Sequence, residues 1–293
     1  RESYIQGRPL EGIAHGRHAV ALLERTAEHW WLGHTYCVLA LNLLHFGDFE
    51  PALEAADRTR ALGQSIGDTR LQTLAAWTAG QIHSLVGDRE TAISLCRRAV
   101  DLAPDPVARG MARGMLGLAY REAEDAPRAI GELEHALGEF RQMRAGGGYR
   151  FGQIDGYFTA VLAEAYVLAS DLERGTALAD EALAAGRAGK WAVAIAYAER
   201  ATARAAWAGA DLVRAAEHMA RALEVFRSTD ARFQTARTEL CMGELTHARG
   251  DAERAAAYLR SAHAAFVALR VPRHVGLVER LAENLHVALG AIP

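Results

Sequence analysis

The chain has 293 residues, of which 51% are hydrophobic and 7% aromatic, and its formal net charge is −3. This near-neutral balance excludes the strongly basic field of a nucleic-acid-binding domain, and the lack of an apolar run near ~20 residues in length argues against a membrane span. The three cysteines are far apart and form no C-x-x-C pair, which argues against a disulfide framework or a zinc knuckle and favours reduced thiols in the cytoplasm.

A short turn that ends in aspartate recurs along the chain, with intervals of 40, 37, 46, 40 and 40 residues. Aspartate suits the N-cap or first turn of a helix, and glycine suits the left-handed residue that ends the helix before it. Each turn is therefore expected to join two antiparallel helices. The turns are expected near 7–8, 47–48, 87–88, 124–125, 170–171, 210–211 and 250–251.

Small residues follow the same period. Every residue four positions after a turn aspartate, and every residue eight positions before one, is alanine or glycine. Two helices that cross at close range need side chains of this size at the contact. The twelve positions are Ala52, Ala92, Ala129, Gly175, Ala215, Ala255, Ala40, Gly80, Gly117, Ala163, Ala203 and Gly243.

This pattern resembles the tetratricopeptide repeat (TPR). The clearest copy carries Leu116-Gly117, Tyr120, Asp125, Ala129-Ile130 and Ala136-Leu137. The resemblance covers residues 1–293 and implies a single all-α domain, a right-handed superhelical solenoid of antiparallel helix pairs. Its ~40-residue repeats exceed the usual 34 residues because the helices are longer.

In chain order we expect about fourteen helices: a lone second helix near 9–26, six pairs, and a capping helix at about 273–288. The 46-residue interval contains an insertion, the loop 145–151, whose glycines stop a helix and permit a sharp turn. A phosphate-binding loop would follow a strand and carry Gly-Lys-Ser/Thr, which this segment lacks. A second hypothesis keeps Tyr149, Arg150 and Phe151 as ligand contacts within a flexible loop.

TPR domains of large bacterial signalling proteins are similar to this chain, and residues 230–275 especially resemble their last repeats. The group includes multidomain signalling ATPases, LuxR-type ATP-dependent regulators and ATPase-fused class III nucleotide cyclases. Since the sequence begins within a repeat, at Arg1, we expect a fragment of a longer protein. The resemblance implies a non-catalytic scaffold that contacts a protein, a peptide, attached domains or a second copy. The alternative is an effector-sensing domain that binds a small molecule or peptide in its concave groove and regulates an attached ATPase, cyclase or DNA-binding domain.

No catalytic constellation stands out in the sequence. His15 and His18 share a helical spacing, but no third ligand accompanies them, so we expect neither a metal nor a cofactor. No G-x-S-x-G elbow occurs, and no pair of carboxylates shows one buried and one solvated member. Stacked helical hairpins usually bind partners, so we expect no enzymatic activity.

In the TPR frame, several aromatic residues fall on the groove side of a first helix. The groove-binding candidates are therefore Trp77, Tyr157, Tyr197 and Trp207, together with Gln81 one turn after Trp77. We interpret Trp30, Trp31 and Trp191 as packing residues. Known TPR peptide clamps hold a C-terminal carboxylate with a lysine and an asparagine one turn apart. The corresponding residues are Cys37 and Leu41 in one repeat, and Trp77 and Gln81 in the next, so a chaperone tail is not an expected partner.

Arg200, Arg204 and Arg237 form a basic cluster on the groove side, beside Tyr197 and Trp207. Guanidinium groups bind carboxylate or phosphate well, so the cluster is a candidate anion site. The alternative is structural. A 40-residue step relates Arg204 to Glu164 and to Glu244, and a ladder of these three would neutralise Arg204 and fix one repeat against the next.

Overall fold

The computed structural model describes residue 3, residues 6–145 and residues 152–289. Within this part of the chain fourteen helices follow one another and no strand occurs. The glycine-rich segment 146–151, including Tyr149, Arg150 and Phe151, lies outside the described residues, so the predictions for that loop stay predictions.

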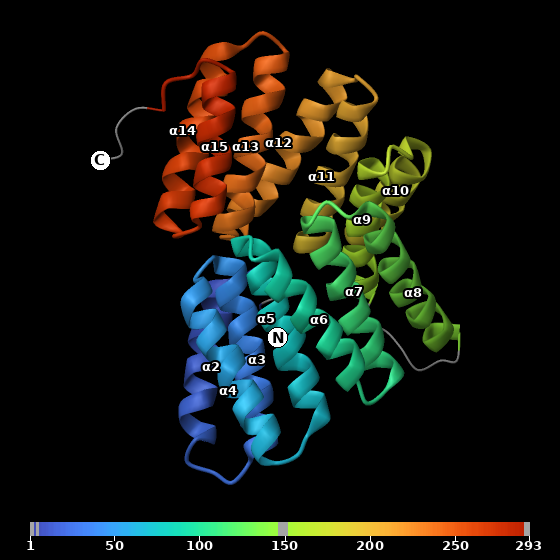
Figure 1. Ribbon diagram of the computed structural model, residues 1–293, viewed down its shortest axis with the longest axis vertical. Helices are drawn as coiled ribbons and strands as arrows, with labels where there is room; N and C mark the ends of the chain where they lie inside the picture. Colours follow the sequence, from blue (N-terminus) through green and yellow to red (C-terminus); the bar gives the residue numbers. More distant parts are fainter. Residues whose placement is uncertain (1–2, 4–5, 146–151, 290–293) are drawn as a thin grey trace.

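The helices form the expected series of a lone helix, six antiparallel pairs and a final helix, stacked into a superhelix (Figure 1). The TPR-like architecture is thus confirmed. Two ends differ from the expectation, since the lone helix stops at Leu23 and the final helix at Asn284. The bounds are α2 Pro9–Leu23, α3 His29–Phe46, α4 Phe49–Ser65, α5 Thr69–Val86, α6 Arg89–Leu102, α7 Pro106–Glu122, α8 Ala126–Ala145, α9 Gly152–Leu168, α10 Leu172–Gly189, α11 Ala192–Ala208, α12 Leu212–Ser228, α13 Arg232–Ala248, α14 Ala252–Ala268 and α15 Pro272–Asn284.

Each predicted turn from 47–48 onward pairs a residue in the left-handed region with an aspartate. The left-handed residue is glycine in three turns, and Glu124, Ser170 and Ala210 adopt the same conformation with φ between 62° and 65°. Five of the six aspartates accept a hydrogen bond from the backbone amide three residues later, as an N-cap does. Asp48 is the exception, because its carboxylate accepts a hydrogen bond from Arg232 of α13 at 2.6 Å.

The small residues lie at the closest approach of the paired helices. A Cβ atom on Gly80 would stand 2.5 Å from Cys96 Sγ, and one on Gly117 would stand 2.6 Å from Leu133 Cγ. The alanines four residues after the turns, such as Ala215, are completely buried. The pair spacing therefore depends on the absence of larger side chains at these positions.

Replacing Ala215 with leucine should lower the free energy of unfolding by about 1–3 kcal/mol, because the added atoms overpack the α11–α12 contact. Ala220→Leu is the matched control, since Ala220 is exposed on the same helix and the change there should cost under about 0.5 kcal/mol. Urea denaturation of both variants tests the repeat frame. Equal losses at the two positions would show that the frame is wrong.

The superhelix closes on itself, so that the last helices touch the turns of the first repeats (Figure 1). The Arg232 guanidinium lies 3.9 Å from the centre of the Phe46 ring, and Arg273 donates a hydrogen bond of 3.1 Å to the Gly87 carbonyl. The rings of Phe49 and Phe233 meet edge to face at 5.5 Å. Residues far apart in sequence therefore share one hydrophobic core.

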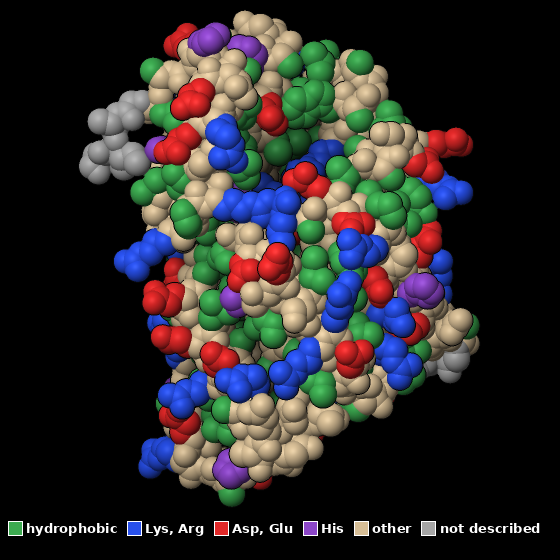
Figure 2. All heavy atoms as spheres, in the orientation of Figure 1, with side chains coloured by type: hydrophobic (Ala, Val, Ile, Leu, Met, Phe, Trp, Pro, Cys, Tyr) green, Lys and Arg blue, Asp and Glu red, His purple; other side chains and the backbone are tan. Residues whose placement is uncertain are grey.

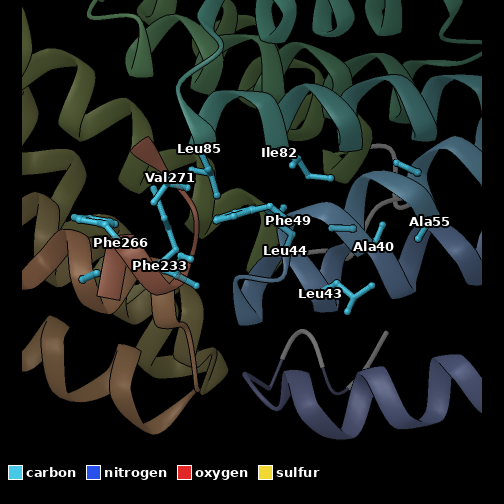
Figure 3. Packing of buried hydrophobic residues seen from close by; sticks show 14 of the residues in the cluster. Ala40, Leu43, Leu44, Phe49, Ala55, Ile82, Leu85, Phe233, Phe266 and Val271 are labelled. Atoms are coloured by element: carbon cyan, nitrogen blue, oxygen red, sulfur yellow. The ribbon is translucent and has the colours of Figure 1, made fainter. Parts of the chain in front are cut away.

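Figure 3 shows this shared core from close by. Phe49 and Leu85 of the first repeats are directed toward Val271, which is completely buried at the start of the final helix. Phe233 and Phe266 complete the cluster from α13 and α14. Because these side chains come from both ends of the chain, their burial stabilises the closed superhelix as a whole.

Two histidines also lie at the closure, the half-buried His45 and the buried His274. Burial lowers the pKa of His45, which hydrogen-bonds to the Thr229 backbone, to about 4. Burial, followed by the positive charge of Arg237, lowers the pKa of His274 to about 4 as well. The His274 ring packs 4.9 Å from Phe233 and 5.0 Å from Phe266, centre to centre. Protonation of either ring would place a charge inside the core.

We expect stability to fall as the pH decreases from about 6.5 to about 4. In this window the unfolded histidines, with an ordinary pKa of about 6.5, bind protons that the folded chain excludes. The loss for each histidine is on the order of 2 kcal/mol by pH 5. Urea denaturation at stepped pH measures the slope, and His274→Gln should flatten it between pH 6.5 and 5. An unchanged slope would show that His274 is not excluded from protonation.

Candidate ligand-binding groove

The first helices of the six pairs, α3, α5, α7, α9, α11 and α13, contribute the inner face of the superhelix. One position per repeat follows the repeat intervals along this face: His34, Leu74, Met111, Tyr157, Tyr197 and Arg237. The position seven residues later holds Leu41, Gln81, Leu118, Glu164, Arg204 and Glu244. The first three repeats thus present mostly apolar groups, whereas the last three present most of the charge.

The apolar half of the inner face contains a cavity of about 370 Å³ between α3, α5, α7, α9 and the start of α11. Aromatic and sulfur-containing side chains provide much of its wall. These are Trp30, Trp77, Trp191, Tyr157, Phe158, Cys37, Met111 and Met115.

The position of Phe158 in the cavity wall depends on Gly114. A Cβ atom there would lie 2.1 Å from the Phe158 ring, so only glycine lets that ring lie against α7. The ring of Phe158 in turn stacks on Phe140, with the planes 7° apart and the centres at 6.2 Å. The part of the cavity wall at Phe158 is therefore closely packed and apolar.

Polar groups around the cavity are few. Burial raises the pKa of the Cys37 thiol to about 11, so this thiol is uncharged at neutral pH. Arg70 is exposed on α5 and pairs with Asp105 before α7. A ligand in the cavity would meet an uncharged wall at Cys37 and an ion pair at Arg70.

Beyond the cavity the inner face is charged. Glu122 accepts hydrogen bonds from both terminal nitrogens of Arg237, at 2.5 and 2.9 Å, and lies 2.9 Å from Arg121. Burial alone would raise the pKa of Glu122, but the Arg121 and Arg237 guanidiniums outweigh it and lower the value to about 2. This pairing joins α7 to α13 across 115 residues of sequence.

A second buried carboxylate, Glu164, holds the other arginines. It accepts a hydrogen bond from Arg200 Nε at 3.0 Å, lies 3.2 Å from Arg121 Nη1, and lies 3.9 Å from Arg204 Nε. Burial opposes its ionisation, but the Arg121 and Arg200 charges hold the pKa of Glu164 well below its usual range. Arg200 also donates to Gln234 at 2.7 Å.

Two tyrosines connect the cavity to the charged cluster. The Tyr157 ring, which lines the cavity, meets the Tyr197 ring edge to face at 4.8 Å. The Arg200 guanidinium lies 4.7 Å from the centre of the Tyr197 ring, in cation–π geometry. The apolar and charged parts of the inner face are therefore in direct contact.

The structure places the eight groove candidates in different surroundings. Trp77 and Tyr157 line the cavity. Trp207 packs against the core cluster of α11, α12 and α13, and Gln81 is buried outside the cavity lining. The others belong to the charged cluster: Tyr197, Arg200, Arg204 and Arg237.

Within that cluster, part of the ladder proposed from the sequence as the alternative to an anion site is present. Arg204 lies 3.9 Å from Glu164, as one step of the expected ladder. Arg200 and Arg237, the other two members of the candidate anion site, are each paired with a carboxylate of the chain itself. An external anion would therefore join an existing ion-pair network.

The sequence interpretation missed several cavity residues. Trp30 and Trp191, assigned to packing, also line the cavity, together with Met111 and Met115. The repeat period contained a signal for Met111, because Met111 is one repeat after Leu74 and one repeat before Tyr157.

The described part of the chain brings no three histidine, cysteine, aspartate or glutamate side chains together as metal ligands. None of its helices combines the length and the apolar character that a transmembrane span requires.

No protein-family model matches the sequence, and no curated protein matches it. Solved structures do. A Rap protein complexed with competence and sporulation factor superposes with a TM-score of 0.74 at 12% identity, over 98% of this chain and 80% of the other. The Rap conjugation gene regulator of plasmid pLS20, in complex with the Phr* peptide, gives 0.63 at 11% identity, over 94% and 80%.

A signal-transduction ATPase with a TPR sensor from Pyrococcus horikoshii gives a TM-score of 0.51 at 15% identity, over 91% of this chain and 40% of the other. At these identities the similarities establish the fold, a TPR-type helical repeat.

Proposed function

We propose that this TPR-type domain is a non-catalytic interaction module that binds a peptide segment of a partner protein in the apolar cavity of its inner face. The observation that carries the proposal is the cavity wall, which contains a tryptophan from α3, one from α5, one from the residue just before α11, and two methionines. Large aromatic side chains anchor peptides well, and flexible methionines adapt to the shape of what they cover. We assign the domain to the C-terminal repeat region of a bacterial signalling or regulatory protein.

The size of the cavity limits the occupant. A volume of about 370 Å³ lies near the lower end of the ~300–1,000 Å³ usual for small-ligand pockets. It accommodates a few apolar side chains, whereas a folded partner could only dock around it. One of the matched structures contains the Phr* peptide, which supports the proposal by analogy of fold.

Met111→Glu tests this assignment. A carboxylate in the cavity would lose hydration on ligand binding without gaining a partner, so affinity should fall at least tenfold. The ligand is a heptapeptide selected from a random display library against the purified domain, and the measurement is isothermal titration calorimetry.

Val213→Glu is the matched control, because Val213 is exposed on α12, outside the cavity lining. Both variants should melt near the wild-type temperature, and the control should bind like the wild type. Selected peptides that bind Met111→Glu as tightly as the wild type would place their site elsewhere.

The apolar wall of the cavity also favours a second candidate, an effector sensor. A small apolar molecule would fill the same space, and its occupancy would regulate an attached ATPase, cyclase or DNA-binding domain. Titration of the full-length polypeptide distinguishes the two functions. A sensor changes the activity of the attached domain when the cavity is filled, whereas a scaffold leaves it unchanged.

A further inference from the structure

The charged half of the inner face carries more positive than negative groups. Its network contains the guanidiniums of Arg121, Arg200, Arg204 and Arg237, and its carboxylates are Glu122 and Glu164. Four positive charges and two negative charges give the network a net charge of +2. If Glu244, which interacts with Arg204, is ionised and counted as well, the net charge is still +1.

Burial makes this excess significant. Arg200 is completely buried and Arg121 is 4% exposed, and Arg200 Nη2 and Arg121 Nε have no hydrogen-bond partner. Arginine keeps its proton in proteins, so the cluster cannot shed charge as a lysine or histidine cluster would. Uncompensated buried charge is costly, and an anion placed against the cluster would relieve that cost.

The cluster reaches solvent through two of its arginines. The side chain of Arg204 is 30% exposed and that of Arg237 is 13% exposed. Arg204 Nη2 lies 4.0 Å from the sulfur of Cys241, one helical turn after Arg237 on α13, so the two arginines lie close together. Figure 2 shows basic and acidic side chains beside a hollow, in the region where Figure 1 places α7, α11 and α13.

We propose that Arg204 and Arg237 form a binding site for an oxyanion, a carboxylate or a phosphate group. Arg121 and Arg200 add to the positive field from behind, while Glu122 and Glu164 hold the guanidiniums in position. We assign the oxyanion to the peptide whose apolar side chains fill the cavity, and this assignment rests on the proposed function. The Tyr157–Tyr197 contact then lies between the two parts of the bound peptide.

The first experiment probes the anion site without any peptide. Calorimetric titration of the purified domain with inorganic phosphate, at constant ionic strength set by chloride, should show saturable binding. Arg204→Gln should weaken phosphate binding at least tenfold, and Glu244→Gln, which removes a competing carboxylate, should strengthen it severalfold. Arg249→Gln is the matched control, because Arg249 is exposed at the end of α13.

If phosphate did not bind, or bound the wild type and Arg204→Gln equally well, the anion site would be overturned. The proposal that a peptide binds in the cavity would be unaffected. A purely structural role for Arg204 predicts that Glu244→Gln lowers the melting temperature and leaves phosphate affinity unchanged. That result would also overturn the site.

The second experiment separates the sources of the oxyanion. The selected heptapeptide is compared with its C-terminally amidated form and with a form whose acidic side chains are replaced by amides. We expect one of these two altered peptides, the one that lacks the bound carboxylate, to bind the wild type at least tenfold more weakly. The same peptide change should not alter the affinity for Arg204→Gln.

If both replacements are neutral while phosphate binds, a phosphate group and not a peptide carboxylate is the ligand, and our assignment to the peptide is wrong. If phosphate binds and no peptide does, the proposed function fails and the anion site stands.

Discussion

Glu164→Ala should lower the free energy of unfolding by about 3–5 kcal/mol, the cost of leaving buried charge without its partner. The Glu164 side chain is 1% exposed and is shared by Arg121 and Arg200. Its removal leaves Arg200 buried and charged without its carboxylate, while Arg121 keeps only Glu122. Urea denaturation measures the loss.

Two controls separate charge from packing. Glu164→Gln keeps the shape and one acceptor oxygen but loses the charge, so it should be destabilised nearly as much as Glu164→Ala. Glu217→Ala removes an exposed carboxylate from α12 and should change stability by less than about 0.5 kcal/mol. If Glu164→Ala were as stable as Glu217→Ala, the network would contribute nothing to the fold.

Phe233→Ala should cost about 3–5 kcal/mol and also loosen the closure of the superhelix. Phe233 is 1% exposed, and its ring contacts Phe49 of α4 and Phe266 of α14. The cavity left by the deletion would lie between segments from opposite ends of the chain. Besides the loss of stability, we expect faster amide hydrogen exchange at turn 47–48.

Phe226→Ala is the matched control for this result. Phe226 is also 1% exposed, but it packs against Tyr197 within a separate core cluster. The Phe226→Ala substitution should lower the free energy of unfolding by a similar amount, without a selective increase in amide hydrogen exchange at turn 47–48. Equal exchange in both variants would show that Phe233 has no special role in closing the superhelix.

The sequence predicted the helix pairs well because the determinants of a repeat are local. The left-handed residue, the capping aspartate and the small contact residues all lie within about twenty residues of one another. The groove-facing placement of Trp77 and Tyr157 could be predicted because it follows from the repeat period, but the cavity that they line could not.

The partners within the charged cluster were much harder to predict. The 40-residue step related Arg204 to Glu164, but nothing local related Arg237 to Glu122, which is 115 residues earlier. Their contact depends on the small rotation between successive repeats, summed over three repeats that include the insertion. For the same reason the sequence did not show that Asp48 would bind Arg232 at the closure.

Hydrogen–deuterium exchange with and without a selected heptapeptide tests whether the inner face holds a peptide segment. Binding in the cavity should slow exchange in the first helices of the pairs, most strongly in α3, α5 and α7, and leave the outer helices α4, α6 and α8 unchanged. If a peptide that binds saturably protected only α4, α6 and α8, its binding site would not lie on the inner face.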